Sequence, residues 1–185
     1  MCRQLFHETG LVFRARGRSS EKIVLEAMNP PTDWEAFFAE YGDVPIPPYL
    51  NRPSDPEDRV RYNTVFASSP ASVAAPTAGL HFTEDTLESL RKRGIETAFV
   101  ELAIGTGTFA PLRLKNFEEN RLHREFYSIA ESAAKTIARA GSIVAVGTTT
   151  LRALESTLRQ RGRIEPGAYS TEIFIRPPDQ MTSAN

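Results

Sequence analysis

The sequence predicts an α/β fold with a mostly parallel sheet flanked by helices, and two observations carry this prediction. Strand-like and helix-like segments alternate through the C-terminal half, as they do in βαβ units. The chain has 185 residues, 41% of them hydrophobic and 24% charged, which is sufficient for a buried core. This composition excludes a disordered chain, a collagen and a disulfide scaffold.

The first forty residues predict a hairpin and a helix. A hairpin is expected over 11–27, because two β-prone runs flank the turn formers Gly-Arg-Ser-Ser. The helix that follows has Thr32 as N-cap, Glu35 as its capping-box partner and Gly42 as its end. Its aromatic residues recur at helical spacing, which predicts packing in a core. They are Trp34, Phe37, Phe38 and Tyr41.

The middle of the chain is rich in proline. Five prolines between Pro45 and Pro56 exclude a helix or a central strand and predict irregular backbone. A strand is expected over 61–67. A helix is expected from Glu84 to Arg93, capped by Thr83.

The remaining segments complete the predicted sheet. In the last helix the leucines define the expected buried stripe and leave Arg152 and Glu155 on other faces. An arginine this close to a helix N-terminus needs a partner, either Glu155 or a ligand anion. Strands are expected over 95–104, 125–130, 142–147 and 169–175, and helices over 132–140 and 150–161.

Charge, cysteine content and apolar runs restrict the function classes. The net charge of −1 gives no domain-wide basic excess for nucleic acid. The single cysteine, Cys2, allows no intrachain disulfide and fits the cytoplasm. The N-terminus has no signal-peptide pattern and no apolar run reaches the ~18 residues of a membrane helix, so no membrane partner is expected.

Two loops after predicted strands suit a ligand, because open α/β sheets bind ligands where strands lead into helices. They are Gly105–Thr108 and Gly147–Thr150, whose glycines and threonines are equally typical of turns and caps. The acidic residue, strand and Gly-x-Gly turn around Glu101 also suggest a Rossmann-type methyltransferase. Phe109 occupies the position of the third glycine of that motif, which ranks this alternative second.

Candidate acid–base groups lie in two segments. His81 lies in a small-residue segment that favours close approach to a ligand. On a strand starting near His123, the side chains of His123, Glu125 and Tyr127 project to one face. They form either an acid–base set or an ordinary polar strand face.

Six ordered motifs between about Gly42 and Pro178 resemble one known family. They are GDVPIPPYLNR, DRVRYNTVFA, SVAAPTAGLHFT, GTGTFAPL, LHREFY and AVGTTTLRALES. Together they resemble the S-adenosylmethionine:tRNA ribosyltransferase-isomerase family of queuosine biosynthesis. The resemblance implies that the ribosyl group of S-adenosylmethionine is transferred to 7-aminomethyl-7-deazaguanine in tRNA and isomerised, which gives epoxyqueuosine.

The resemblance also implies the residues of a site. S-adenosylmethionine is expected as the ribosyl-donor substrate rather than a cofactor, tRNA as the partner, and no metal. The expected acid–base residues are His81, His123, Glu125 and Tyr127. The expected substrate-binding residues are Pro76, Thr77, Ala78, Gly79, Gly105, Gly107, Thr108, Thr148, Thr149 and Arg152. The expected tRNA contacts are Arg52, Arg61 and Tyr62.

The resemblance implies a partial-length member. Residues 1–41 are expected to be the remnant of an inserted β-barrel domain with its return helix, and residues 42–185 a catalytic-type α/β domain. Family members begin earlier and continue further, and have a histidine where this chain has Ala103. The function is therefore expected to be the transferase-isomerase reaction, inactive if the missing parts are essential. The alternatives are a noncatalytic tRNA- or nucleoside-binding remnant and the methyltransferase.

Overall fold

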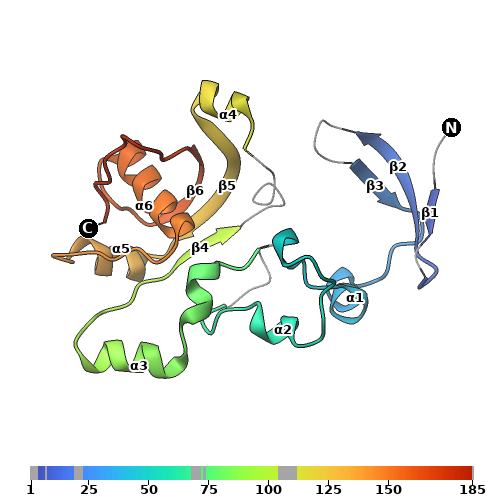
Figure 1. Ribbon diagram of the computed structural model, residues 1–185, viewed down its shortest axis with the longest axis horizontal. Coiled ribbons are helices and arrows are strands. Elements are labelled where there is room, and N and C mark those ends of the chain that lie inside the picture. Colours follow the sequence, from blue (N-terminus) through green and yellow to red (C-terminus); the bar gives the residue numbers. More distant parts are fainter. Residues whose placement is uncertain are drawn as a thin grey trace. The chain divides into compact units, whose positions relative to one another are not determined.

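The computed structural model describes residues 4–6, 8–18, 23–67, 72, 74–103 and 112–184. The chain divides into two compact units, Met1–Asp43 and Val44–Asn185 (Figure 1). Each unit has a three-stranded sheet accompanied by helix, so the predicted mixed α/β class is confirmed. None of the helices in the described ranges has the length and apolarity that crossing a membrane requires.

The first unit contains the predicted hairpin. Strands β2 (Val12–Arg18) and β3 (Ile23–Ala27) pair antiparallel, and β1 (Gln4–Phe6) pairs antiparallel with the other edge of β2. The register shifts between Ala15 and Gly17, which marks a bulge in β2. The described strands form an open sheet of three and do not close into a barrel.

Helix α1 (Trp34–Tyr41) follows the hairpin and ends at Gly42, as predicted. Its N-cap is Asp33 rather than Thr32, because the Asp33 carboxylate accepts hydrogen bonds from the N–H groups of Glu35 and Ala36. The expected burial of its aromatic stripe is wrong, since no α1 residue is buried. The rings instead stack on one another and on Phe13 of β2.

The second unit begins with irregular backbone, as the prolines predict. It contains the 3₁₀ turns η1 (Pro48–Leu50) and η2 (Thr77–His81). The strand expected over 61–67 is wrong: helix α2 (Asp58–Arg61) ends there and a turn follows. The β-prone residues were outweighed by the reciprocal hydrogen bonds between Asp55 and Asp58, which fix a helical start.

The sheet of the second unit has the order β4 (Val100–Ala103), β5 (Arg121–Ile129) and β6 (Gly167–Ile173). Both pairings are antiparallel, so the expected mostly parallel sheet is not found in the described residues. The strand expected over 142–147 is also absent. This apolar segment is not part of a strand in the structure, and Val144 is 80% exposed there, so no parallel crossover forms.

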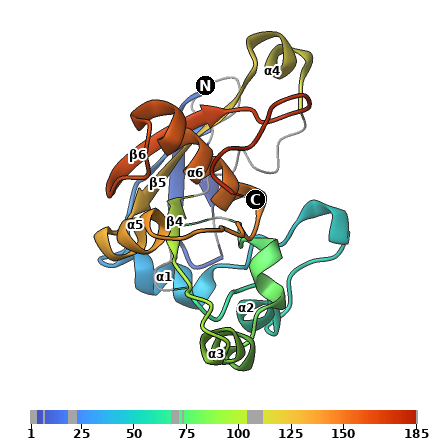
Figure 2. The same cartoon turned by 90° about the vertical axis from the view of Figure 1, so that its left-hand side faces the viewer.

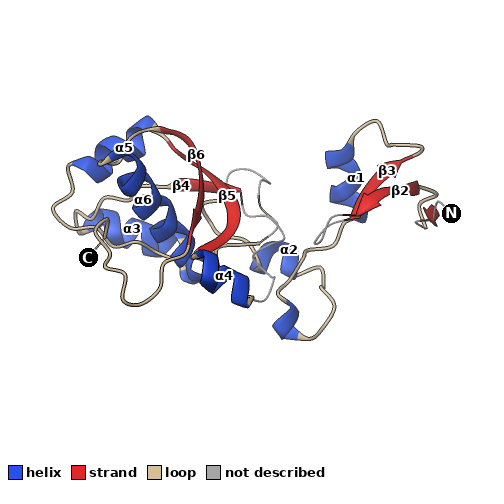
Figure 3. Ribbon diagram, turned by 90° about the horizontal axis from the view of Figure 1, so that it is seen from above, coloured by secondary structure: helices blue, strands red, loops and turns tan. Residues whose placement is uncertain are grey.

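Four helices follow α2 in the described part of the second unit. They are α3 (Glu84–Lys92), α4 (Leu114–Glu119), α5 (Glu131–Ala138) and α6 (Thr148–Arg161). The predicted Thr83 cap of α3 is confirmed, because its hydroxyl accepts the N–H of Thr86. Figures 2 and 3 show α6 lying beside the sheet.

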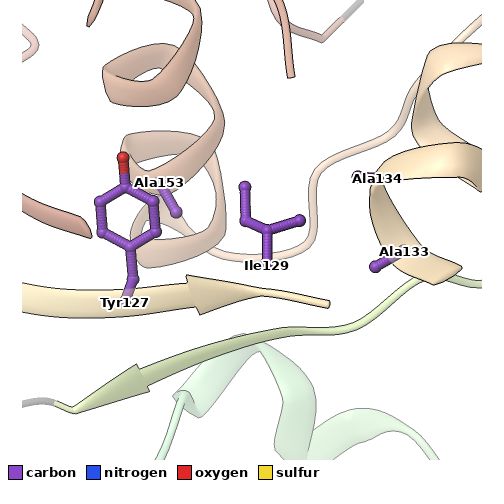
Figure 4. Packing of buried hydrophobic residues seen from close by; sticks show 5 residues of the cluster. All are labelled: Tyr127, Ile129, Ala133, Ala134 and Ala153. Atoms are coloured by element: carbon purple, nitrogen blue, oxygen red, sulfur yellow. The ribbon is translucent and has the colours of Figure 1, made fainter. Parts of the chain in front are cut away.

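The core lies between β5, α5 and α6. Tyr127 and Ile129 point from β5 toward Ala153 of α6 and the alanines Ala133 and Ala134 of α5 (Figure 4). The alternation along β5 explains this, since Glu125, Tyr127 and Ile129 are buried while Phe126 is exposed.

The buried face of α6 differs from the prediction. Leu154 is buried as expected, but Leu151 and Leu158 are only half-buried. The expected outward placement of Arg152 and Glu155 is wrong, because both are buried together with Ser156 and Thr157. Burial of these polar residues is tolerated because each has a hydrogen-bond partner. Arg152 and Thr157 pair with β5, Glu155 pairs with the C-terminal segment, and Ser156 accepts from Gln160 of α6.

Candidate active site

The candidate site is centred on Glu125, in the middle of β5. Its side chain is 1% exposed and faces α6. Arg152 Nη1 donates to Glu125 Oε2 at 2.5 Å, and His123 Nε2 lies 2.8 Å from Glu125 Oε1. The strand periodicity therefore brings His123 and Glu125 to one face, and α6 supplies the arginine from 27 residues away in sequence.

Arg152 is a buried cation with an incomplete set of partners. Its side chain is 10% exposed, and its pairing is with Glu125 rather than with Glu155. Burial lowers the pKa of the Arg152 guanidinium, and the charge of Glu125 opposes that shift. In the described part of the chain, Nε and Nη2 of Arg152 have no hydrogen-bond partner. These two nitrogens of the buried guanidinium can donate hydrogen bonds to a further polar ligand.

Tyr127 lies deeper than the other members of this strand face. It is 3% exposed, and its hydroxyl is 2.9 Å from Thr157 Oγ1. Thr157 already donates its own hydrogen to the Ala153 carbonyl, so the Tyr127 hydroxyl is the donor in their hydrogen bond. The Tyr127 hydroxyl thus links β5 to α6 inside the core.

The segment that carries the predicted nucleoside-binding residues forms η2. Gly79 is buried, and a Cβ at this position would lie 2.7 Å from the Phe66 ring, so this close packing requires glycine. A Cβ built on Gly147, the N-cap of α6, would lie 3.6 Å from Ala78. The structure therefore brings the segment Pro76–Gly79 next to the start of α6, where Thr148 and Thr149 lie.

His81 ends η2 and is exposed. Within the described ranges it has no hydrogen bond or ion pair that joins it to Glu125 or His123. The structure therefore brings together three of the predicted residues, His123, Glu125 and Arg152, which we call the Glu125 cluster, and leaves His81 outside their hydrogen-bond network. Gly105, Gly107 and Thr108 lie outside the described residues.

The predicted tRNA contacts lie around α2. Arg52 donates to both carboxylate oxygens of Asp58 at 2.7 Å and also contacts Asp55. Hydrogen bonding from Arg52 lowers the pKa of Asp58 to about 2, with further help from the Asp55 N–H. Arg61 is exposed and contacts Glu57 at 3.4 Å, and burial raises the pKa of the half-buried Tyr62.

A cavity lies on the open face of the second sheet, opposite α6. Phe126 of β5 projects into it and is 60% exposed. Among the predicted site residues, Tyr127 borders it, while the Glu125 cluster lies on the other face. In the described ranges no group of three His, Cys, Asp or Glu side chains could hold a metal ion.

Comparison with known proteins decides the family. The family described as "Queuosine biosynthesis protein" matches residues 4–185. The chain belongs to this family. The match includes the whole Glu125 cluster and the segments around η2 and α6.

Curated relatives carry a more specific name. Three proteins named S-adenosylmethionine:tRNA ribosyltransferase-isomerase are similar to this chain over most of its length. The protein of Dechloromonas aromatica is 43% identical over 165 residues, 87% of this chain and 47% of the relative. The protein of Geobacter metallireducens is 44% identical over 165 residues, which are 87% of this chain and 48% of the relative. The protein of Pelobacter propionicus is 48% identical over 148 residues, which are 78% of this chain and 43% of the relative. The chain thus spans about half the length of these relatives.

Two features next to the Glu125 cluster were not predicted from the sequence. Thr157 is the partner of Tyr127, and Glu155 accepts the backbone N–H groups of Thr182 and Ser183 at 2.6 and 2.7 Å. Burial raises the pKa of Glu155, but these donors and Arg159 outweigh it and hold the pKa below its usual value. No sequence signal identifies these pairs, because the partners are 27 to 30 residues apart.

Proposed function

We propose that this chain carries out the reaction for which its relatives are named. The ribosyl group of S-adenosylmethionine is transferred to 7-aminomethyl-7-deazaguanine in tRNA and isomerised, with release of adenine and methionine, to give epoxyqueuosine. The observation that carries this proposal is the buried Glu125–Arg152 pair with His123 at its edge, inside a family match that covers residues 4–185.

The residues divide into an acid–base group and a pocket. The proposed catalytic set is His81, His123, Glu125 and Tyr127, in which Glu125 holds His123 and Tyr127 supports the strand face from the core. Arg152 and the neighbouring start of α6 form one wall of the substrate pocket, since free N–H groups and a guanidinium suit the polar parts of a nucleoside. The other wall residues are Pro76, Thr77, Ala78, Gly79, Gly105, Gly107, Thr108, Thr148 and Thr149.

Substrate tRNA is the proposed macromolecular partner. Arg61 is the strongest candidate for a phosphate contact, because it is exposed and only weakly paired with Glu57. Tyr62 is proposed to stack on a base. Arg52 is proposed to act indirectly, because Asp58 and Asp55 already occupy its donors.

The family relationship also supports a proposed domain assignment. Residues 1–41 would correspond to the remnant of an inserted β-barrel domain, and residues 42–185 to the catalytic-type domain. The cytoplasm is the proposed location, as the place of tRNA modification.

The test is adenine release from S-adenosylmethionine in the presence of tRNA that carries the precursor base. We expect release with this tRNA and none with tRNA that lacks the base. Binding of tRNA without release would favour the noncatalytic alternative. Formation of S-adenosylhomocysteine would instead favour a methyltransferase. The antiparallel pairing of β4, β5 and β6 disfavours this alternative, because a Rossmann-type sheet is mostly parallel.

A further inference from the structure

The two ring nitrogens of His123 have different surroundings. Nε2 lies 2.8 Å from Glu125 Oε1, at the buried end of the ring. Within the described ranges, Nδ1 has no hydrogen-bond partner. The His123 side chain is 31% exposed, whereas that of Glu125 is 1% exposed. One nitrogen is thus held by the protein and the other is available to a ligand.

The Arg152 contact decides which nitrogen carries the proton in the neutral ring. A protonated Glu125 would leave the buried Arg152 cation without a counter-charge, which is strongly unfavourable. Glu125 is therefore a carboxylate and only accepts hydrogen bonds. His123 Nε2 must then donate to it, so in the neutral ring Nδ1 carries a lone pair that has no partner among the described residues.

From this geometry we propose that His123 Nδ1 is the proton acceptor of the site and that Glu125 and Arg152 are positioning residues. The proposal rests on the proposed function and assigns one step of it. The positive sulfur of S-adenosylmethionine acidifies the C5′–H bond. That bond breaks, its electron pair stays on C5′ beside the sulfonium, and the proton forms an N–H bond with Nδ1.

The surroundings of His123 suit a general base better than the surroundings of His81 do. The His123 ring is fixed through Glu125, and Glu125 is fixed through Arg152, so the reactive nitrogen has a defined direction. The carboxylate also stabilises the imidazolium that forms when Nδ1 gains a proton. His81 is exposed, and in the described part of the chain it lacks such a carboxylate.

The first experiment measures the tautomer of the neutral His123 ring by NMR and does not require catalysis. The full chain, which has three histidines, is labelled with ¹⁵N-histidine, and long-range ¹H–¹⁵N spectra are recorded at alkaline pH. His123→Gln assigns the signals. We expect the Nε2–H form in the wild type and a mixture of tautomers in Glu125→Gln, because an amide both donates and accepts. The control Glu172→Gln removes a carboxylate that pairs with Arg124, and should leave the spectrum unchanged.

An Nδ1–H form in the wild type, or a Glu125→Gln spectrum identical to that of the wild type, would overturn the proposal. Glu125→Gln disturbs a buried pair, so His123→Gln provides the second variant. It replaces a part-exposed ring and leaves the Glu125–Arg152 contact in place.

The second experiment measures adenine release. His123→Gln should lower kcat by about 10²- to 10⁴-fold with little change in KM for S-adenosylmethionine, the range for losing a general base. Added imidazole should restore part of the rate of His123→Gly. A kcat loss below about 10-fold would overturn the base role. Absence of release from the wild type would instead refute the proposed function, and the base role with it, whereas the spectra still report the tautomer.

Discussion

At the level of single residues, the candidate site depends on one buried ion pair. Glu125 and Arg152 are both almost inaccessible, and each compensates the charge of the other. A buried pair of this kind contributes little net stability compared with apolar residues, but it is very sensitive to loss of one partner. Loss of either partner is therefore expected to lower the stability of the fold and to disturb the geometry of the site.

Replacing Arg152 alone should show this sensitivity. Arg152→Met leaves the Glu125 carboxylate buried without a counter-charge and should lower the free energy of unfolding by about 3–5 kcal/mol. The double variant Glu125→Met with Arg152→Met should recover most of that loss. Urea unfolding of the three proteins measures both effects. An Arg152→Met protein within about 1 kcal/mol of the wild type would contradict the importance of the pair.

The Tyr127 hydroxyl offers a second test at this scale. Tyr127→Phe keeps the ring in the core and removes only the hydrogen bond to Thr157, so we expect a loss of about 1 kcal/mol in unfolding free energy. Adenine release by the folded protein should persist, since the hydroxyl is proposed to act in packing. Loss of activity at unchanged stability would assign Tyr127 to the chemistry instead.

At the level of elements, the short helix α2 is held by a side-chain network rather than by its length. Four residues are too few for a helix to be stable alone. Asp58 is the centre of this network, because Arg52 and the Asp55 N–H both donate to it. These hydrogen bonds hold the irregular segment before α2 against the first turn of the helix.

The low pKa of Asp58 predicts a pH dependence. The folded-state pKa of about 2 is below the ordinary aspartate pKa of 3.8, so the contribution of Asp58 to stability is fully present above pH 3.8. It is lost as the pH falls from about 3.8 to about 2. Asp58→Asn should remove this part of the acid dependence. Unfolding free energies of the two proteins, compared at several pH values, should converge across that window, and parallel curves would contradict the network.

Element types were predictable where local signals act alone. The hairpin, α1, α3 and α6 follow from turn residues, caps and helical spacing. Strand direction was not predictable in this way, because alternating strands and helices indicate a parallel sheet only if the apolar segment 142–147 pairs. The leucine pattern of α6 likewise could not reveal that Arg152 and Glu155 are buried, since their partners come from β5 and from Thr182–Ser183.

The site was predictable to a similar extent. Strand periodicity placed Glu125 and Tyr127 on one face with His123, and the structure has them there. The partner of Arg152 was not predictable from α6 alone, because the nearer acid, Glu155, is taken up by backbone N–H groups of the C-terminal segment. Long-range pairing of buried charges is the information that a single sequence lacks.

At the scale of the whole molecule, the balance of basic and acidic residues bears on the proposed recognition of tRNA. The chain has 22 basic and 23 acidic residues, so it has no general attraction for a polyanion. Several exposed basic side chains are also paired with acids, as Arg52 is with Asp58. The proposed binding of tRNA is therefore expected to depend on a few local contacts.

Arg61 provides a test of these contacts. Arg61→Ala should weaken tRNA binding and reduce the slope of log K against log salt by about 1, because one phosphate contact is lost. Stability should change by less than about 0.5 kcal/mol, since the side chain is exposed. Filter binding over a series of salt concentrations measures the slope. The control Arg159→Ala removes another exposed arginine and should leave the slope unchanged; an unchanged slope for Arg61→Ala would exclude it from the interface.

The polar buried face of α6 has a consequence for how the chain finds its native packing. A purely apolar helix can slide or rotate against a sheet with small changes in energy. A displacement of α6 by one residue would separate Arg152 from Glu125, Thr157 from Tyr127, and Glu155 from the Thr182 and Ser183 N–H groups at the same time. Each separation would leave a desolvated polar group unpaired. We therefore expect misdocked arrangements of α6 to be sparsely populated, so that the helix has a single register on the sheet.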